Sequence, residues 1–540
     1  MNRFKSFIMY MIVLGISVGL LTGIGISSSR LNRLVKEHHL HATGDVSNAP
    51  PIVAFTTVAL GSFRGLLADL LWLRTTALQD EGNYFEMVQL ASWITKLQPN
   101  FTGATAYLAW NMAYNISVTC SSPEDRWRWI QRGIELIRDE AIQYNPEDPL
   151  LYKELGWIYQ HKIGNIMDDA NLYYKNQIAV ALSRVFGGST PNWKEWANTP
   201  QTFADFRQSM SAPNRQALTK ALEDSGFTPS TLETYFRENE KLPEAFVSKY
   251  DQPENLRRLI TFLRVNWLVS VYKLDPRLIL TINEKYGALD WRLPESQAIY
   301  WATKGLEMTP LHKDLSCERM ITQSLKDAFM GGRLLMADTK GFATVITVPN
   351  LNVVDTVRKT FQKAEEDNKS SSFRSAMLNF MKDAIVILYN FGNYTKAQEY
   401  LNMLRKEEPG KPELNVSLDL FVLKEWAEDV RDATPKQAND IISGLLYRSC
   451  NYLVYGDMDA ALAHERLARF VYNRYMKEHE DTKERTGLAA YAKIKEAVTQ
   501  SCLRNFAPPL AKILQAYLDQ EKAKAQEAQA EADKAADKKP

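Results

Sequence analysis

Two stretches far apart in this chain carry the same spacing of glycine and proline around an amphipathic run. The sequence GNY at Gly82 precedes a run that ends at Pro99, and GNY at Gly392 precedes one that ends at Pro409, so both separations are 17 residues. Apolar residues recur at three- and four-residue spacing here and through most of the chain, which predicts helices. Because a single helix pair cannot bury its apolar face alone, we expect such pairs to stack on one another.

A third stretch strengthens this reading and resembles a known family. Tyr152-x2-Leu155-Gly156-x2-Tyr159 stands in phase with Pro146. This pattern resembles the tetratricopeptide repeat, which implies an all-α superhelix of helix pairs in an irregular array. Residues 59–164 are also similar to a group of membrane-anchored bacterial repeat proteins, in stretches such as AWNMAYNISV and NPEDPLLYKELGWIYQHKIG. That similarity implies only an anchor followed by repeats.

The resemblance also implies a binding groove, because in that family the first helix of each pair lines a concave surface that grips extended peptides. Carried over by register from Pro146 and from Gly392, the groove positions are Lys153, Trp157, Gln160, His161, Lys382, Tyr389 and Asn390. Basic and amide groups beside aromatic rings can hold a peptide backbone or a carboxylate. The alternative for Trp157 and Tyr389 is packing within or between repeats.

The amino-terminal region predicts a single transmembrane helix. Residues 7–26 are twenty residues without a charge, enough to cross a bilayer, although a cleaved signal peptide is the alternative. Basic residues on the two sides nearly balance, and the very short preceding tail favours an extracytoplasmic location for the bulk of the chain. Gly15, Gly19 and Gly23 fall on one helix face, where they can pair two such helices into a homodimer, although glycine is also common in membrane helices.

The layout follows from these patterns and from changes in composition. In chain order, we expect a short tail at 1–6, the transmembrane helix at 7–26, a linker at 27–51, tetratricopeptide-like helical repeats at 52–181, an irregular helical insert at 182–290, a helical region at 291–380, further helical repeats at 381–518, and a mobile charged tail at 519–540. The helical region at 291–380 is expected to contain one small β-hairpin near 332–349. A helix is expected to start at Pro294, since proline fits the first turn of a helix.

Composition and motifs argue against several classes of function. Lys+Arg is 65 against Asp+Glu 64, and a net charge of +1 does not suit a nucleic-acid-binding protein. Four cysteines at wide intervals, with no C-x-x-C pair, predict neither a structural zinc site nor a disulfide-dense scaffold. The adjacent acids Asp168 and Asp169 are expected at a solvated helix end. Phosphate-binding, dinucleotide-binding, zinc-protease and hydrolase-elbow motifs are missing from the sequence, so we expect no enzyme, no cofactor and no metal site.

The sequence therefore favours a membrane-anchored helical-repeat scaffold of the bacterial cell envelope, whose partners are other proteins. Two alternatives stay open. One is a membrane-tethered hydrolase or transferase with its site in the 182–290 insert, where Trp193, Trp196, Trp267 and Trp291, in or near that insert, are able to line a sugar- or lipid-binding cleft. The other is an accessory subunit of a transport or secretion complex.

Overall fold

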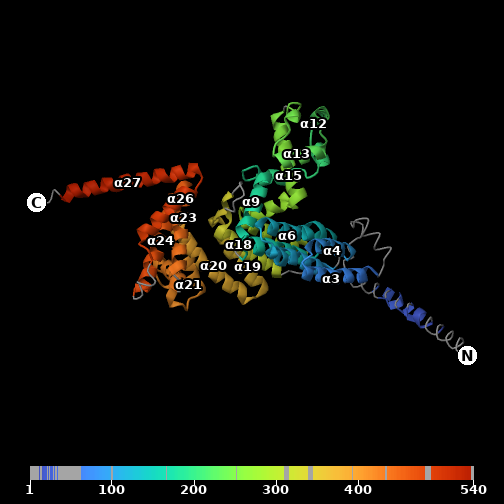
Figure 1. Ribbon diagram of the computed structural model, residues 1–540, viewed down its shortest axis with the longest axis horizontal. Coiled ribbons are helices and arrows are strands. Elements are labelled where there is room, and N and C mark those ends of the chain that lie inside the picture. The colour runs from blue at the N-terminus through green and yellow to red at the C-terminus, as the bar shows by residue number, and fades with distance from the viewer. Residues whose placement is uncertain are drawn as a thin grey trace. The chain divides into compact units, whose positions relative to one another are not determined.

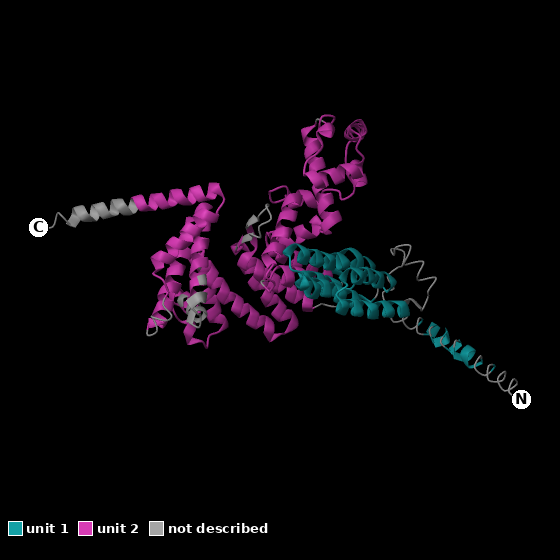
Figure 2. Ribbon diagram, viewed as in Figure 1, with its two compact units in different colours: residues 1–158, 307–311 teal, residues 159–306, 312–540 magenta. Residues whose placement is uncertain are grey.

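The computed structural model describes residues 11, 15–20, 22–23, 25–27, 29–30, 33, 63–98, 101–165, 167–250, 252–308, 315–337, 345–391, 393–431, 435–480 and 488–536. These residues are mainly α-helical, which confirms the predicted all-α class. They form two compact units, residues 1–158 with 307–311, and residues 159–306 with 312–540 (Figure 2). We call them unit 1 and unit 2.

Unit 1 is built from helix pairs (Figure 1). In chain order its elements are α3 Phe63–Glu81, α4 Tyr84–Leu97, α5 Thr102–Asn111 with its continuations η2 Met112–Ile116 and η3 Ser117–Thr119, α6 Pro123–Glu135 with η4 Leu136–Ala141 and α7 Ile142–Tyr144, and α8 Pro149–Trp157, which continues as η5 Ile158–Ile163, whose residues from Tyr159 on are assigned to unit 2. Gly82 has φ +73° in the turn between α3 and α4, directly before the amphipathic run noted in the sequence. A backbone angle in this left-handed region favours glycine.

The second helix pair of unit 1 depends on a close approach of backbones. A Cβ atom added to Gly133 of α6 would lie 2.7 Å from the carbonyl oxygen of Ala109 in α5, so only glycine fits at this crossing. Ile130 and Ile134 of α6 and Ala109 and Met112 of α5 and η2 are fully or almost fully buried. The crossing therefore fixes where α5 lies, and with it the outward face of α5.

Local signals explain several helix starts. At four described helix starts, a serine, aspartate or threonine stands directly before a proline, and its side-chain oxygen accepts a hydrogen bond from a backbone N–H of the first turn. These pairs are Ser122-Pro123, Asp148-Pro149, Thr228-Pro229 and Asp275-Pro276. The cap satisfies a backbone donor that the helix leaves unpaired, and proline loses nothing at the first helical position.

Unit 2 holds the remaining described elements. In chain order they are α9 Asn171–Phe186, α10 Trp193–Ala197, α11 Phe203–Gln208, α12 Ala212–Ser225, α13 Pro229–Asn239, α14 Glu244–Val247, α15 Pro253–Tyr272, α16 Pro276–Tyr286, α17 Pro294–Met308, whose last two residues are assigned to unit 1, α18 Leu315–Gly331, β1 Arg333–Ala337, β2 Val345–Val348, η6 Leu351–Val353, α19 Val354–Asn368, α20 Ser371–Asn390, α21 Tyr394–Glu407, η7 Pro412–Leu414, α22 Leu418–Arg431, α23 Pro435–Val454, α24 Met458–Glu478, α26 Tyr491–Asn505 and α27 Pro508–Ala536. The predicted helix start at Pro294 is confirmed.

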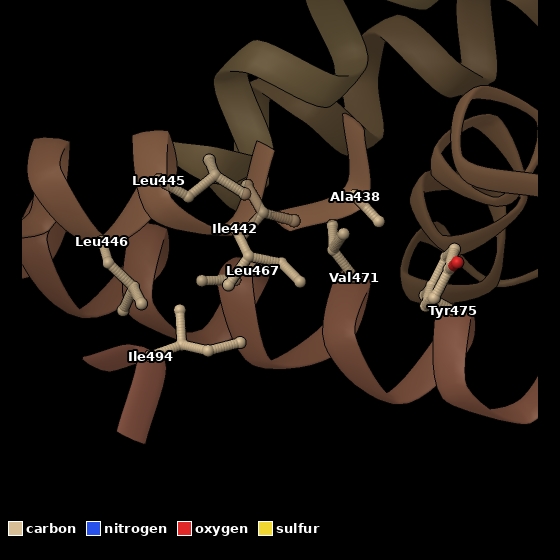
Figure 3. Packing of buried hydrophobic residues seen from close by; sticks show 9 residues of the cluster. Ala438, Ile442, Leu445, Leu446, Leu467, Val471, Tyr475 and Ile494 are labelled. Carbon is tan, nitrogen blue, oxygen red and sulfur yellow. The ribbon is translucent and has the colours of Figure 1, made fainter. Parts of the chain in front are cut away.

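Helix pairs recur near the end of unit 2. Gly456 has φ +79° in the turn between α23 and α24, and Asp457 caps α24 through the backbone N–H of Ala460 at 3.0 Å. Apolar side chains of α23, α24 and α26 close on one another in a cluster (Figure 3), whose buried members are Ala438, Ile442, Leu445, Leu446, Leu467, Ala468, Val471, Tyr475 and Ile494. Asn393 likewise caps α21 after α20, whereas Gly392 lies outside the described residues.

Two further expectations concern the hairpin and the amino terminus. Strands β1 and β2 pair antiparallel, with Arg333 opposite Val348, which confirms the hairpin predicted near 332–349. Residues 7–10, 12–14, 21 and 24 of the predicted span 7–26 lie outside the described residues. Within the described part of the chain, none of the helices combines the length and apolar character needed to cross a bilayer. The predicted tail at 519–540 continues α27 as a helix as far as Ala536.

Candidate functional surface

A row of aromatic rings runs along the first helices of the two pairs in unit 1. The ring of Trp72 in α3 lies 6.3 Å from that of Phe101 and 5.5 Å from that of Tyr107 in α5. Tyr107 and Trp110 are stacked at 6.4 Å, and Trp110 and Tyr114 of η2 at 5.3 Å. Phe101 is 48% exposed and Tyr107 46%, while the other three rings are half-buried. We call these five residues the aromatic row.

Amide side chains accompany the aromatic row. Asn111 Nδ2 of α5 donates to Gln79 Oε1 of α3 at 2.5 Å, and Asn115 Nδ2 of η2 donates to Asn111 Oδ1 at 2.7 Å. Asn111 is completely buried and Asn115 is exposed. We call these three residues the amide chain. It extends from the interior of unit 1 to solvent, beside rings that face the same way.

The sequence places both features on one helix face. Residues 107, 110, 111, 114 and 115 follow the i, i+3, i+4, i+7, i+8 spacing of a single face. The helix widens into a π-turn at η2, a feature often found at functional sites, and η2 carries Tyr114 and Asn115. The groove register carried from the repeat family missed these residues, although the spacing within YLAWNMAYN was available to find them.

Two of the predicted groove residues also lie in unit 1. The ammonium of Lys153 is 5.9 Å from the ring centroid of Trp157, within reach of a cation–π contact, and forms an ion pair with Glu154 at 2.6 Å. Both Lys153 and Trp157 are half-buried on α8, which packs against α5. The predicted pair therefore sits on the helix next to the one that carries most of the aromatic row.

The next two predicted groove residues, Gln160 and His161, belong to unit 2. Gln160 Nε2 donates to Ser324 Oγ at 2.7 Å and to the carbonyl oxygen of Met320 at 3.3 Å, both on α18. Burial, and secondly the charge of Lys162, lower the pKa of His161. The amide donor of Gln160 thus contributes to packing within unit 2.

The predicted groove residues of α20 contact the helix that follows their own pair. Tyr389 donates its hydroxyl proton to Asp419 Oδ1 at 2.6 Å, and Lys382 lies 3.8 Å from Glu425. Burial, together with Asp419, raises the pKa of Tyr389 to about 12. The side chain of Asn390 lies outside the described residues. These contacts make α22 the immediate partner of Lys382 and Tyr389.

A concave surface of unit 1 lies on the second helices of the pairs. A groove of about 970 Å³ is lined by α4, α6 and the turn before α6. Phe85 of α4 is 86% exposed there, and its ring lies 5.9 Å from that of Trp129 in α6. Arg128 at its edge is paired with Asp125 at 2.7 Å. This groove offers a matched comparison surface for the aromatic row.

Unit 2 contains ionisable groups that no sequence motif indicated. Lys175 of α9, Glu295 of α17 and Asp327 of α18 interact electrostatically, and all three are half-buried. Burial raises the pKa of Glu295 to about 8, with a further rise from Asp327. Burial also raises the pKa of Asp327 to about 6 and lowers the pKa of Lys175. We call these residues the acid cluster; it can hold or release a proton near neutral pH.

The acids at 168 and 169 behave differently from the prediction. Asp168 is buried and lies 2.6 Å from the equally buried ammonium of Lys162, so the expected solvated helix end is wrong for this residue. Its second oxygen accepts from the backbone N–H of Ala170 at 2.9 Å. Asp169 is exposed, as predicted. Two adjacent acids point in different directions at a helix start, which lets one be buried and the other solvated.

The four tryptophans of the insert region pack mainly as core. Trp196, Trp267 and Trp291 are buried, and Trp193 is half-buried between the rings of Trp196 and Trp291, at 5.6 and 6.1 Å. Trp291 also donates its indole N–H to Asn283 Oδ1 at 3.1 Å. Buried rings that contact one another stabilise the unit and leave little surface with which to line a cleft.

The glycines predicted to pair two membrane helices are exposed. A Cβ atom added to Gly15, Gly19 or Gly23 would meet nothing within 4 Å. Within the described residues, no group of three or more histidine, cysteine, aspartate or glutamate side chains is arranged to hold a metal ion. Neither a known family model nor a curated protein matches this chain.

Proposed function

We propose that this protein is a membrane-anchored helical-repeat scaffold of the cell envelope that binds an extended segment of another protein along the aromatic row of unit 1. The observation that carries the proposal is the run of ring contacts from Trp72 to Tyr114 beside the amide chain. The tetratricopeptide-like arrangement of the helix pairs is part of the same proposal.

The chemistry of the surface suits a peptide. Aromatic side chains supply a large apolar area at low cost in conformational entropy, so they are common anchors in protein interfaces. An amide side chain can donate to and accept from a peptide backbone at once. Asn111 holds Asn115 by a hydrogen bond at 2.7 Å, and this orients the exposed amide before a ligand arrives. Apolar side chains of the bound segment would pack on Tyr107 and Phe101.

A membrane anchor would hold this binding surface close to partners in the membrane. The uncharged run at 7–26 is proposed to hold the chain in the membrane, with the helical units outside the cytoplasm. Confinement near the membrane raises the effective concentration of membrane partners, so contacts of modest affinity can suffice. A protein with this layout would recruit or organise other envelope proteins.

The experiment compares two surface variants of the full chain. Tyr107→Ala combined with Asn115→Ala removes an exposed ring and an exposed amide from the proposed face. Phe85→Ala removes an exposed ring from the second-helix groove and serves as the matched control. Cross-linked partners are recovered from detergent-solubilised membranes and quantified by mass spectrometry.

We expect the double variant to recover at least about tenfold less partner than the parent protein does. The reason is that two interface contacts of this kind together contribute more than about 1.4 kcal/mol to binding. The control should keep its partners, and both variants should retain the melting temperature of the parent protein. Loss of partners in Phe85→Ala alone would place the binding surface on the second helices and refute the proposal.

A further inference from the structure

Two cysteines 52 positions apart in the sequence, 450 and 502, meet in the fold. Cys450 lies on α23 and Cys502 on α26, and both belong to one buried apolar cluster with Val454 and Leu514. The two thiols share a hydrogen bond. Helices α23 and α26 also pack against each other through the cluster shown in Figure 3. Nothing in the spacing of the cysteines indicated this contact.

We propose that Cys450 and Cys502 are a modification site, at which thiol–disulfide exchange with a low-molecular-weight disulfide joins α23 to α26 covalently. Both side chains lie in one buried cluster, and closing the bond requires the two sulfur atoms to approach to about 2.05 Å. This inference is independent of the proposed binding function.

The surroundings assign different roles to the two thiols. Cys450 is 7% exposed and Cys502 is not exposed at all, so an external disulfide meets Cys450 first. The hydrogen bond with Cys502, another with Thr499 and the nearby charge of Lys495 lower the pKa of Cys450. The same hydrogen bond, together with burial, raises the pKa of Cys502. Because the thiolate is the nucleophile, Cys450 is the attacking group and Cys502 the resolving group.

The exchange balances with glutathione disulfide as the oxidant. The Cys450 thiolate attacks one sulfur of glutathione disulfide, forming a mixed disulfide and expelling one glutathione thiolate, which takes up the proton that Cys450 had lost. Cys502 then gives up its proton and attacks the Cys450 sulfur, and the second glutathione leaves as a thiolate that is protonated in turn. The protein loses two hydrogen atoms and two electrons, and the oxidant becomes two glutathione thiols.

The other cysteines provide controls. Cys120 is half-buried in unit 1, and Cys317 is buried in α18 of unit 2. Neither lies in the cluster that holds Cys450 and Cys502. The test exposes the reduced full chain to glutathione disulfide, both in native buffer and during refolding from urea, and then maps disulfide-linked peptides by mass spectrometry.

We expect a loss of two hydrogen atoms from the parent protein and one linked peptide pair, containing Cys450 and Cys502. Cys120→Ser and Cys317→Ser should behave like the parent protein. Cys502→Ser should stop at a glutathione adduct on Cys450, whereas Cys450→Ser should form no adduct at Cys502 in native buffer. The oxidised parent protein should melt at a higher temperature than the reduced one, because the bond closes a long loop.

Three results would overturn the proposal. The first is four free thiols after both treatments, which would mean that the helices hold the sulfur atoms apart. The second is a disulfide that includes Cys120 or Cys317. The third is a glutathione adduct on Cys502 rather than Cys450 in native buffer, which would reverse the assigned roles. Formation of the Cys450–Cys502 bond only during refolding supports the site and shows that burial controls access to it.

Discussion

Replacing Glu295 with glutamine should stabilise the folded protein at neutral pH and remove part of the pH dependence of its stability. Glu295 stands in the first turn of α17, half-buried beside Asp327 and Lys175. Burial raises its pKa from 4.5 to about 8, so the folded protein keeps the carboxyl protonated at pH 7 while the unfolded chain ionises it. Glutamine has nearly the same shape and carries no charge at any pH.

The size and sign of the effect follow from proton linkage. In the unfolded chain, pH 7 lies about 2.5 pH units above the pKa of this carboxyl. At about 1.36 kcal/mol per pH unit, ionisation of the unfolded chain disfavours the folded state by on the order of 3 kcal/mol. The folded pKa is raised, so the folded state binds the proton more tightly. Stability is therefore highest below about pH 4.5, falls as the pH rises towards 8, and levels off above it.

Urea unfolding followed by tryptophan fluorescence at pH 5, 7 and 8 measures this effect, since Trp291 and Trp301 are buried close to Glu295 in the chain. We expect Glu295→Gln to gain on the order of 2–3 kcal/mol at pH 7 and much less at pH 5. Glu244→Gln, an exposed first-turn glutamate of α14, should change little at any pH. Equal gains at pH 5 and 8, or a loss of stability at pH 7, would show that the folded protein holds Glu295 ionised beside Lys175.

Three further substitutions test the packing. Asp168→Asn removes the carboxylate that lies 2.6 Å from the buried ammonium of Lys162 and should destabilise unit 2 by about 3 kcal/mol in urea unfolding, with unchanged stability as the contrary result. Gly133→Ala places a methyl group 2.7 Å from the carbonyl oxygen of Ala109 and should cost about 1–3 kcal/mol; a neutral effect on the unfolding midpoint would contradict the close crossing of α5 and α6. Thr228→Ala removes the cap of α13 and should lower the unfolding free energy by about 1 kcal/mol, which a midpoint equal to that of the parent protein would rule out.

The helix pairs were predictable because their signals are local. A glycine turn separates one helix from the next at Gly82 and at Gly456, and Asp457 caps the helix that follows Gly456. The hairpin near 332–349 was also predictable, because the pattern of apolar and polar residues that indicates its strands lies within a few residues of sequence. Such features depend on neighbours in the sequence and need no knowledge of the tertiary fold.

The functional surface was only partly predictable, because it depends on contacts between distant segments. Register from the repeat pattern led to α8 and α20, but Tyr389 of α20 bonds to Asp419 of α22, and no spacing rule foresees that neighbour. The acid cluster and the Cys450–Cys502 pair each join helices that are far apart in the sequence. Composition and residue spacing therefore do not predict either of them.

Site-specific photo-cross-linking in living cells tests the proposed binding surface most directly. A photoreactive phenylalanine analogue at position 107 stands on the aromatic row, and the same group at position 85 stands on the exposed face of α4. We expect a discrete cross-linked protein partner from position 107, lost when Asn115→Ala is introduced alongside it, and a weaker or absent product from position 85. A strong product from position 85 with none from position 107 would contradict binding along the aromatic row.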